Sequence, residues 1–217
     1  MPAKDSANTH KSQEQLALAL INRGKLREAE RIYTNLVKLG STNDIVHGNL
    51  GALLQKKGDI FSAILFLKKS LILNPYNPNV HNNLGIAFGD QGDLSSAISC
   101  FKKAIELKLS FPEAHYNLGN AFKKNGELAA AISSYQTALK LNPNYPEAHY
   151  NLGNALKDKG DLTAAISSYQ TQQRLDTTNR ISHLVPNANS HGLWGRSENS
   201  CCRLTRKRPT ITLGARY

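Results

Sequence analysis

Residues Pro112–Tyr145 read PEAHYNLGNAFKKNGELAAAISSYQTALKLNPNY, and the segment that follows from Pro146 repeats most of them as PEAHYNLGNALKDKGDLTAAISSYQT. The triplet Asn-Leu-Gly recurs every 34 residues, at 49–51, 83–85, 117–119 and 151–153. A fixed period of this length is typical of a solenoid, in which copies of one supersecondary unit stack on each other. The register predicts an array over residues 10–176, with units at 10–43, 44–77, 78–111, 112–145 and 146–179, the last one incomplete.

Each unit is predicted to fold as helix–turn–helix. In the fourth unit, His115, Leu118 and Phe122 stand at i, i+3 and i+7, which places them on one face of a helix. A second helical stripe begins at Ala131. Between the two stripes, position 15 of every unit is a glycine, which ends a helix readily because it accepts the left-handed conformation. The second helix is expected to end near Asn-Pro at 74–75 and 142–143, since proline cannot continue it.

Small residues at two positions predict how the helices of a unit pack. Position 8 is glycine in units two to five, and position 20 is alanine in all five units. Small side chains on facing stripes let two helices approach closely, and a leucine there would cost roughly 1–3 kcal/mol through overpacking. One helix pair cannot bury both of its apolar stripes, so the units are expected to stack into a one-dimensional array. Unit one, with Ala17 in place of the glycine, is expected to act as a cap.

The pattern resembles the tetratricopeptide repeat (TPR). The residues of unit four that fall at this family's offsets are Leu118, Gly119, Phe122, Gly126, Ala131, Tyr135, Ala138 and Pro143. The fifth unit departs from the pattern at Gln172 and Thr177, which replace the usual alanine and proline. The resemblance implies an all-α, right-handed superhelical solenoid of five TPR units. The form Tyr-Asn-Leu-Gly-Asn is also similar to the repeats of O-linked N-acetylglucosamine transferases and of bacterial arrays fused to glycosyl- or sulfotransferase domains.

In this family the first helices of the units line a concave groove, and this implies a set of partner-binding residues. Asparagine both donates and accepts hydrogen bonds, so a ladder of amides can hold the backbone of an extended peptide, as in the similar glycosyltransferase repeats. Simple inheritance of an exposed residue by close copies is the other interpretation of the ladder. The predicted partner-binding residues are Asn49, Asn83, Asn117, Asn151, Asn120, Asn154, Tyr116, Tyr150, Lys123, Lys124 and Lys157. A carboxylate clamp of the kind that holds chaperone C-termini is disfavoured, because position 5 is never lysine.

The histidines at position 4 of units two to five are His47, His81, His115 and His149. Zinc requires ligand nitrogens about 2.1 Å from one ion, whereas stacked helices lie roughly 8–10 Å apart. We therefore expect packing residues and no metal site. The sequence also contains no phosphate-binding loop and no nucleophile motif, so we expect no catalytic site, no cofactor and no small-molecule substrate.

The composition changes after about residue 176. Residues 180–217 contain seven Lys or Arg and one acidic residue, so they carry more than half of the net charge of +11. The segment 177–217 is expected to be a disordered basic tail, and residues 1–9 a disordered N-terminus. The tail has two interpretations: a basic arm for nucleic acid or an acidic surface, or accidental sequence from a frameshift or a truncated gene. A nucleic-acid partner is expected only through this tail.

Together these features predict a protein–protein interaction scaffold that holds an extended segment of a partner in its concave groove. The alternative is the substrate-recognition part of a larger glycosyl- or sulfotransferase whose catalytic domain is absent here. No stretch is apolar enough to predict a membrane span or a secretion signal. The three cysteines, Cys100, Cys201 and Cys202, form no disulfide framework, which fits a reducing compartment. We therefore expect a cytoplasmic protein without a membrane partner.

Overall fold

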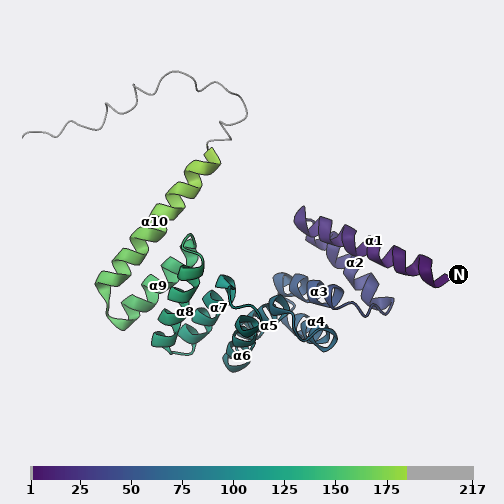
Figure 1. Ribbon diagram of the computed structural model, residues 1–217, viewed down its shortest axis with the longest axis horizontal. Coiled ribbons are helices and arrows are strands. Elements are labelled where there is room, and N and C mark those ends of the chain that lie inside the picture. Colours follow the sequence, from purple (N-terminus) through teal and green to yellow (C-terminus); the bar gives the residue numbers. More distant parts are fainter. Residues whose placement is uncertain (1, 185–217) are drawn as a thin grey trace, which may run out of the picture. The chain divides into compact units, whose positions relative to one another are not determined.

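The computed structural model describes residues 2–184, and the side chains of residues 9–177 within that range. The secondary-structure elements of this part of the chain are all α-helices, which follow one another along the array in sequence order (Figure 1). The helices are α1 (Pro2–Asn22), α2 (Leu26–Lys38), α3 (Asp44–Lys57), α4 (Ile60–Leu73), α5 (Pro78–Gln91), α6 (Leu94–Leu107), α7 (Pro112–Lys124), α8 (Leu128–Leu141), α9 (Pro146–Lys159) and α10 (Leu162–Leu184). The predicted all-α solenoid of five helix–turn–helix units is confirmed.

The units follow the predicted register. The first helices of units two to five begin at Asp44, Pro78, Pro112 and Pro146, the residues at which these units were predicted to start. The position-15 glycines all adopt positive φ, from 73° at Gly24 to 93° at Gly160, as their role in ending a helix requires. Asp59, Asp93 and Asp161 then cap the second helices, since each carboxylate accepts a hydrogen bond from a backbone N–H three residues on.

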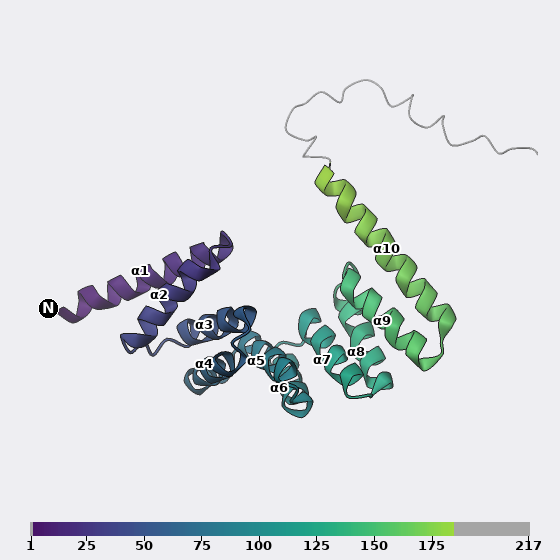
Figure 2. The same ribbon diagram turned by 180° about the vertical axis from the view of Figure 1, so that it is seen from behind.

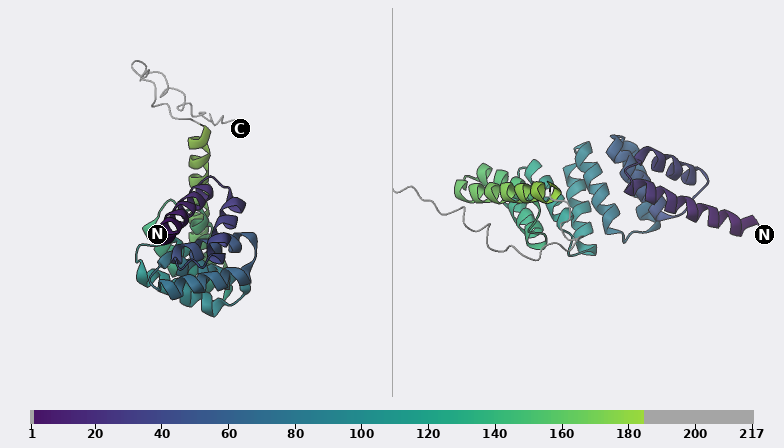
Figure 3. Two further views of the ribbon diagram at one scale, coloured as in Figure 1. Left: turned by 90° about the vertical axis from the view of Figure 1, so that its right-hand side faces the viewer. Right: turned by 90° about the horizontal axis from the view of Figure 1, so that it is seen from above.

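The core consists of several small apolar clusters shared between successive helices. One cluster joins α1, α2, α3 and α4 through residues such as Leu36, Leu50 and Ala63, and another joins α8, α9 and α10. Each helix packs mainly against its neighbours in sequence, and Figures 2 and 3 show the same order from other directions. In addition, the first helices of neighbouring units contact each other, α3 with α5, α5 with α7 and α7 with α9. The first helices α3, α5, α7 and α9 therefore form one continuous layer, here called the inner layer.

The glycine at position 8 is required by the side chain at position 24. A Cβ atom on Gly119 would lie 2.6 Å from the ring of Tyr135, and one on Gly153 would lie 2.6 Å from Tyr169. The alanines at position 20 are almost wholly buried. The predicted close approach of the two helices is thus present, although the side chain that lies over the glycine is the one at position 24.

Helices α1 and α10 extend into segments that were expected to be disordered, and α6 ends without the proline that follows α4. Lys108, which precedes Leu109 instead of proline, has the same φ and ψ as Asn74, −142° and 93°, so α6 ends as sharply as α4. Helix α1 begins at Pro2, so the residues expected to form a disordered N-terminus are helical from there on. Helix α10 continues to Leu184, past Thr177, the position at which units two and four have proline, because threonine does not stop a helix as proline does.

The last unit leaves an apolar face open. Ile166 of α10 is 56% exposed, whereas its equivalent in unit four, Ile132, is 8% exposed and packs with α9 residues. The predictions for Cys201, Cys202 and the basic tail beyond residue 184 lie outside the described residues. Within residues 2–184, no helix is long and apolar enough to cross a membrane.

Candidate peptide-binding groove

The position-6 asparagines tie the first helices of neighbouring units together. The Nδ2 atom of Asn151 donates to the hydroxyl of Tyr116, at 3.0 Å, and to Oδ1 of Asn120, at 2.9 Å. Asn117 donates in the same direction to Oδ1 of Asn82, at 3.0 Å. Both amides therefore reach back to position 5 of the preceding unit, and Asn151 also reaches position 9. The NH₂ donors that the sequence assigned to a peptide are used, at these two sites, by the array itself.

Asn83 and Asn49 show how the partner depends on the preceding unit. Positions 5 and 9 of unit two are Gly48 and Ala52, which offer no polar side chain, and among the described residues Asn83 has no hydrogen-bond partner. Asn49 donates instead to the hydroxyl of Tyr33, at 3.0 Å, on the second helix of unit one. Asn83 is thus the position-6 amide whose donors and acceptor are both open.

The position-9 asparagines accept hydrogen bonds from the tyrosines at position 24, of which Tyr135 is buried and Tyr169 is partly buried. Asn120 and Asn154 each accept a hydrogen bond, at 2.7 and 2.8 Å, from Tyr135 and Tyr169 respectively. Burial is the main cause that raises the pKa of Tyr135, so its hydroxyl stays protonated and remains a donor. These two asparagines were predicted to bind a partner, yet their carbonyl oxygens support the core.

Aromatic rings line the inner surface of units four and five. The ring of Tyr116 lies 5.0 Å from that of Tyr145 and 6.1 Å from that of Tyr135, while Tyr150 is 51% exposed. Burial and the neighbouring Tyr116 raise the pKa of Tyr145 to about 12. The sequence did not single out Tyr145 or Asn82, although both contact predicted site residues.

Two hollows are lined by successive first helices together with a second helix, one by α7, α9 and α10 and the other by α5, α6 and α7. The larger has a volume of about 320 Å³ and is lined by Tyr116, Pro146, Glu147, Tyr150, Asn151, Gln172 and Asp176. The smaller, about 150 Å³, lies between α5 and α7 and includes Asn117, Asn120 and Lys124. Six of the predicted residues therefore line a hollow: Tyr116, Tyr150, Asn117, Asn120, Asn151 and Lys124.

The remaining predicted lysines differ in their surroundings. Lys123 forms an ion pair with Asp158 of the next unit, at 3.4 Å, so its charge is partly compensated. Lys157 is exposed on α9. A hollow of about 1090 Å³ lies between α2 and α3; its lining includes Arg27, Arg31 and Lys56 and none of the predicted residues.

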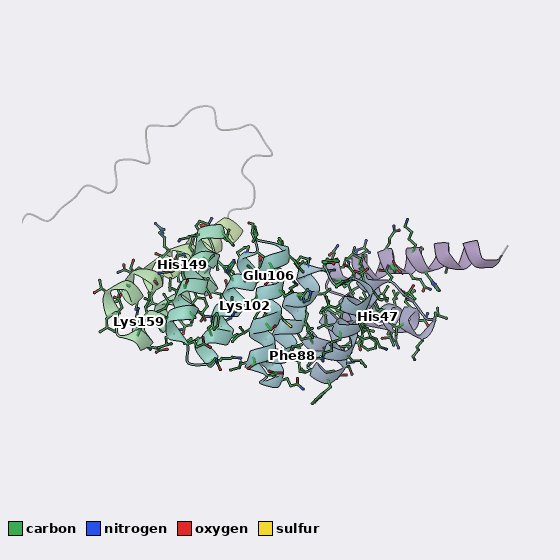
Figure 4. All side chains as sticks on the ribbon, turned by 60° about the horizontal axis from the view of Figure 1, so that its bottom comes forward. His47, Phe88, Lys102, Glu106, His149 and Lys159 are labelled. Carbon is green, nitrogen blue, oxygen red and sulfur yellow. The ribbon has the colours of Figure 1, made fainter. Side chains whose placement is uncertain are left out.

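The position-4 histidines lie apart from one another, and each bonds to the loop that precedes its own helix. Nε2 of His47, His81 and His149 lies 2.9, 2.9 and 3.1 Å from the carbonyl oxygen of the residue six positions earlier, and because a carbonyl only accepts, the ring donates. Figure 4 shows His47 and His149 on different parts of the array. In the part of the chain that the structure describes, no group of three or more His, Cys, Asp or Glu side chains could hold a metal ion.

The fold and the row of polar and aromatic side chains on its inner layer define a helical-repeat array of the kind that binds other chains. Residues 87–126 and 119–160 match the family model described as TPR repeat, and residues 146–179 match the model described as tetratricopeptide repeat. Residues 87–179 carry tetratricopeptide repeats. No curated protein sequence matches it.

Solved structures with the same fold are similar over nearly their whole length. The crystal structure of MamA is 24% identical, with a TM-score of 0.68, and the match covers 76% of this chain and 96% of that one. MamA 41-end from Desulfovibrio magneticus RS-1 is 21% identical, with a TM-score of 0.69, over 78% of this chain and 96% of that one. YrrB, titled a TPR protein with an unusual peptide-binding site, is 18% identical, with a TM-score of 0.64, over 85% of this chain and 97% of that one.

Proposed function

We propose that this protein is a non-catalytic scaffold that binds an extended peptide segment of a partner protein along the first helices α5, α7 and α9. The observation that carries the proposal is the continuous row of amides and tyrosines on these helices, with a hollow between each neighbouring pair. The fold that it shares with YrrB, a TPR protein titled as having a peptide-binding site, supports the same function.

The proposed contacts use the atoms that the array leaves open. The NH₂ groups of Asn117 and Asn151 donate hydrogen bonds to side chains of the preceding unit. Their Oδ1 atoms would accept hydrogen bonds from backbone N–H groups of the peptide. Asn83 would both donate and accept. The amides lie one unit apart, and this regular spacing suits an extended backbone, which offers an N–H and a C=O at every residue.

The hollow between α7 and α9 favours one kind of side chain. Its lining combines the carboxylates of Glu147 and Asp176 with the exposed ring of Tyr150. A positive charge is attracted both by a carboxylate and by the face of an aromatic ring. We therefore expect a Lys or Arg side chain of the partner at this point. Lys124 and Lys157 lie near the C-terminal ends of α7 and α9, where they would face acidic residues of the partner.

The transferase-fragment alternative has less support. The match covers 96–97% of each of the three solved chains named above, so those chains consist of the repeat array itself. Binding of nucleic acid would rest on residues 185–217, which lie outside the described part. A cytoplasmic location is part of the proposal and agrees with the cysteine pattern of the sequence.

The proposal is tested by selecting peptides from a random displayed library against the full chain and mapping the best one by NMR. The side-chain amide signal of Asn83 and the ring signals of Tyr150 should shift on titration. Signals of Gln136, on the exposed side of α8, should stay unchanged. Shifts confined to second helices would refute the assignment of the groove.

A further inference from the structure

Helix α4 exposes a stripe of large apolar side chains. Phe61 is 77% exposed, Leu65 53% and Ile72 81%. At 100° per residue they fall within a sector of about 40° on the helix surface, and they span about 16 Å along its axis. The opposite side of α4 supplies the core, through Ala63, Ile64 and Leu67 among others. The α4 stripe, defined as Phe61, Leu65 and Ile72, is therefore a second apolar face that covers nothing within the array.

The other units show that the fold does not require this stripe. Phe61, Leu65 and Ile72 occupy positions 18, 22 and 29 of the repeat. At these positions the other four units carry Arg27, Arg31 and Lys38; Ser95, Ser99 and Glu106; Ala129, Ser133 and Lys140; Thr163, Ser167 and Arg174. All of these are polar, charged or small. Since large apolar side chains gather at these positions in one unit out of five, the α4 stripe marks an interaction surface.

Positive charge flanks the stripe on both sides. Lys68 and Lys69 are exposed and lie at about −20° and +80° from Phe61 on the helix surface. Lys68 Nζ lies 5.3 Å from the ring centre of Phe88, and Lys69 Nζ lies 5.5 Å from that of Phe66, so both stems stay close to the array. Helix α4 itself contains no acidic residue. Such a surface is complementary to an apolar stripe with acidic neighbours.

The same charges argue against two other occupants. In a symmetric antiparallel pairing of two copies through α4, the lysines at 68 and 69 would lie near their own equivalents, which is unfavourable. The C-terminal segment 180–217 carries seven Lys or Arg against one acidic residue, so it would also be repelled. A single straight stripe three helical turns long fits the ridge of another helix.

We propose that the outer face of α4 is a second docking surface, separate from the groove, and that it binds an amphipathic helix of a partner whose apolar stripe is flanked by Asp or Glu. Such a helix presents anchors at i, i+4, i+7 and i+11. The groove is built on first helices, whereas this surface belongs to a second helix. One array could then hold two different segments at once, an extended one and a helical one.

Two designed helical peptides of 18 residues test the proposal by fluorescence anisotropy with the full chain. Both carry the same Leu stripe, one with Glu flanks and one with Lys flanks. The Glu-flanked peptide is expected to bind at least ten-fold more tightly, and Lys68→Glu with Lys69→Glu should reverse the preference. Equal binding of both peptides, or of neither, would overturn the proposal.

A matched variant carries the residues of unit three at the same positions: Phe61→Ser, Leu65→Ser and Ile72→Glu. Because unit three folds with Ser95, Ser99 and Glu106 there, the variant should keep its helicity by circular dichroism and lose the Glu-flanked peptide. If the triple variant does not fold, Ile72→Glu alone, at the most exposed residue, should weaken binding at least ten-fold. Unchanged affinity would contradict the proposal. So would a preference for anionic vesicles over the peptide, or a dimer that Ile72→Glu dissociates.

Discussion

The hydroxyl of Tyr135 donates a hydrogen bond to the amide oxygen of Asn120, 2.7 Å away on the other helix of the same unit. Tyr169 and Asn154 repeat this pair in unit five, at 2.8 Å. In unit three the same two positions hold Phe101 and Ile86, so the hydroxyl and its acceptor are absent together. In units two to five the pair is thus present or absent as a whole, whereas in unit one, where position 9 is Leu18, the hydroxyl of Tyr33 bonds to Asn49 instead.

This coupling predicts a non-additive effect on stability. Asn120→Ile should lower the free energy of unfolding by about 1–3 kcal/mol, because the buried Tyr135 hydroxyl loses its acceptor. Adding Tyr135→Phe should recover at least half of that loss, since the double variant recreates the pair of unit three. Urea unfolding of the four members of the cycle measures both effects. Simple additivity of the two substitutions would show that the hydrogen bond contributes nothing.

The glycines offer a matched pair for the packing of a unit. Gly119→Ala should destabilise the protein by roughly 1–3 kcal/mol, because the new Cβ would meet the buried Tyr135 ring at 2.6 Å. Gly89→Ala should be neutral or stabilising by up to about 1 kcal/mol, since its Cβ would meet only Ala97, at 4.0 Å, and alanine favours the helix. Thermal unfolding of both variants compares them. Equal effects would mean that position 8 imposes no special packing constraint.

One histidine links stability to pH. Burial lowers the pKa of His115 below its ordinary value of 6.5, while a backbone hydrogen bond with Leu109 acts in the opposite direction. The folded chain then binds this proton less readily than the unfolded chain does. The contribution of His115 to the free energy of unfolding is therefore fully present above pH 6.5, and it is lost as the pH falls below 6.5. An NMR titration midpoint below 6.5, and a shallower loss of stability in His115→Gln, are expected; a midpoint above 6.5 would contradict this assignment.

Cys100 should be an unreactive thiol. Burial raises its pKa from 9.0 to about 11, with nearby Lys68 opposing the shift. At pH 8 its thiolate fraction should be about 100-fold lower than in the unfolded chain, since each pKa unit changes that fraction roughly ten-fold. The folded state keeps the thiol proton of Cys100 up to a higher pH than the unfolded state does, so the free energy of unfolding should fall as the pH rises from 9 toward 11. In a Cys201→Ser, Cys202→Ser background, a disulfide reagent should react slowly with the folded protein and rapidly in urea; similar rates would refute burial of this thiol.

The periodicity of the sequence predicts the fold well because each repeated residue has a local cause. The glycine that ends each first helix and the aspartates that begin most second helices act within a few residues of their own position. The end of α10 could not be predicted with the same rule, since Thr177 neither continues nor stops a helix strongly.

The site was harder to predict because its hydrogen bonds cross from one unit to the next. Asn83 and Asn117 occupy the same position of the repeat, but position 5 of the preceding unit differs between them. It is Gly48 for Asn83 and Asn82 for Asn117. A comparison of position 6 with positions 5 and 9 of the preceding unit would have shown the difference. The exposure of Phe61 and Ile72 could likewise be recognised only once the packed face of α4 was known.

The most direct test of the account compares two double variants in their affinity for a peptide selected against the full chain. Asn83→Ala with Tyr150→Ala removes an open amide and an exposed ring from the inner helices while leaving the bonds between units intact. Ser99→Ala with Ser133→Ala alters exposed residues of two second helices. Because one hydrogen bond contributes about 0.5–1.5 kcal/mol, the first variant should weaken binding by roughly 2- to 12-fold from the amide alone, and more with the ring. The second should bind as the wild type does; equal affinity of all three proteins would contradict binding in the groove.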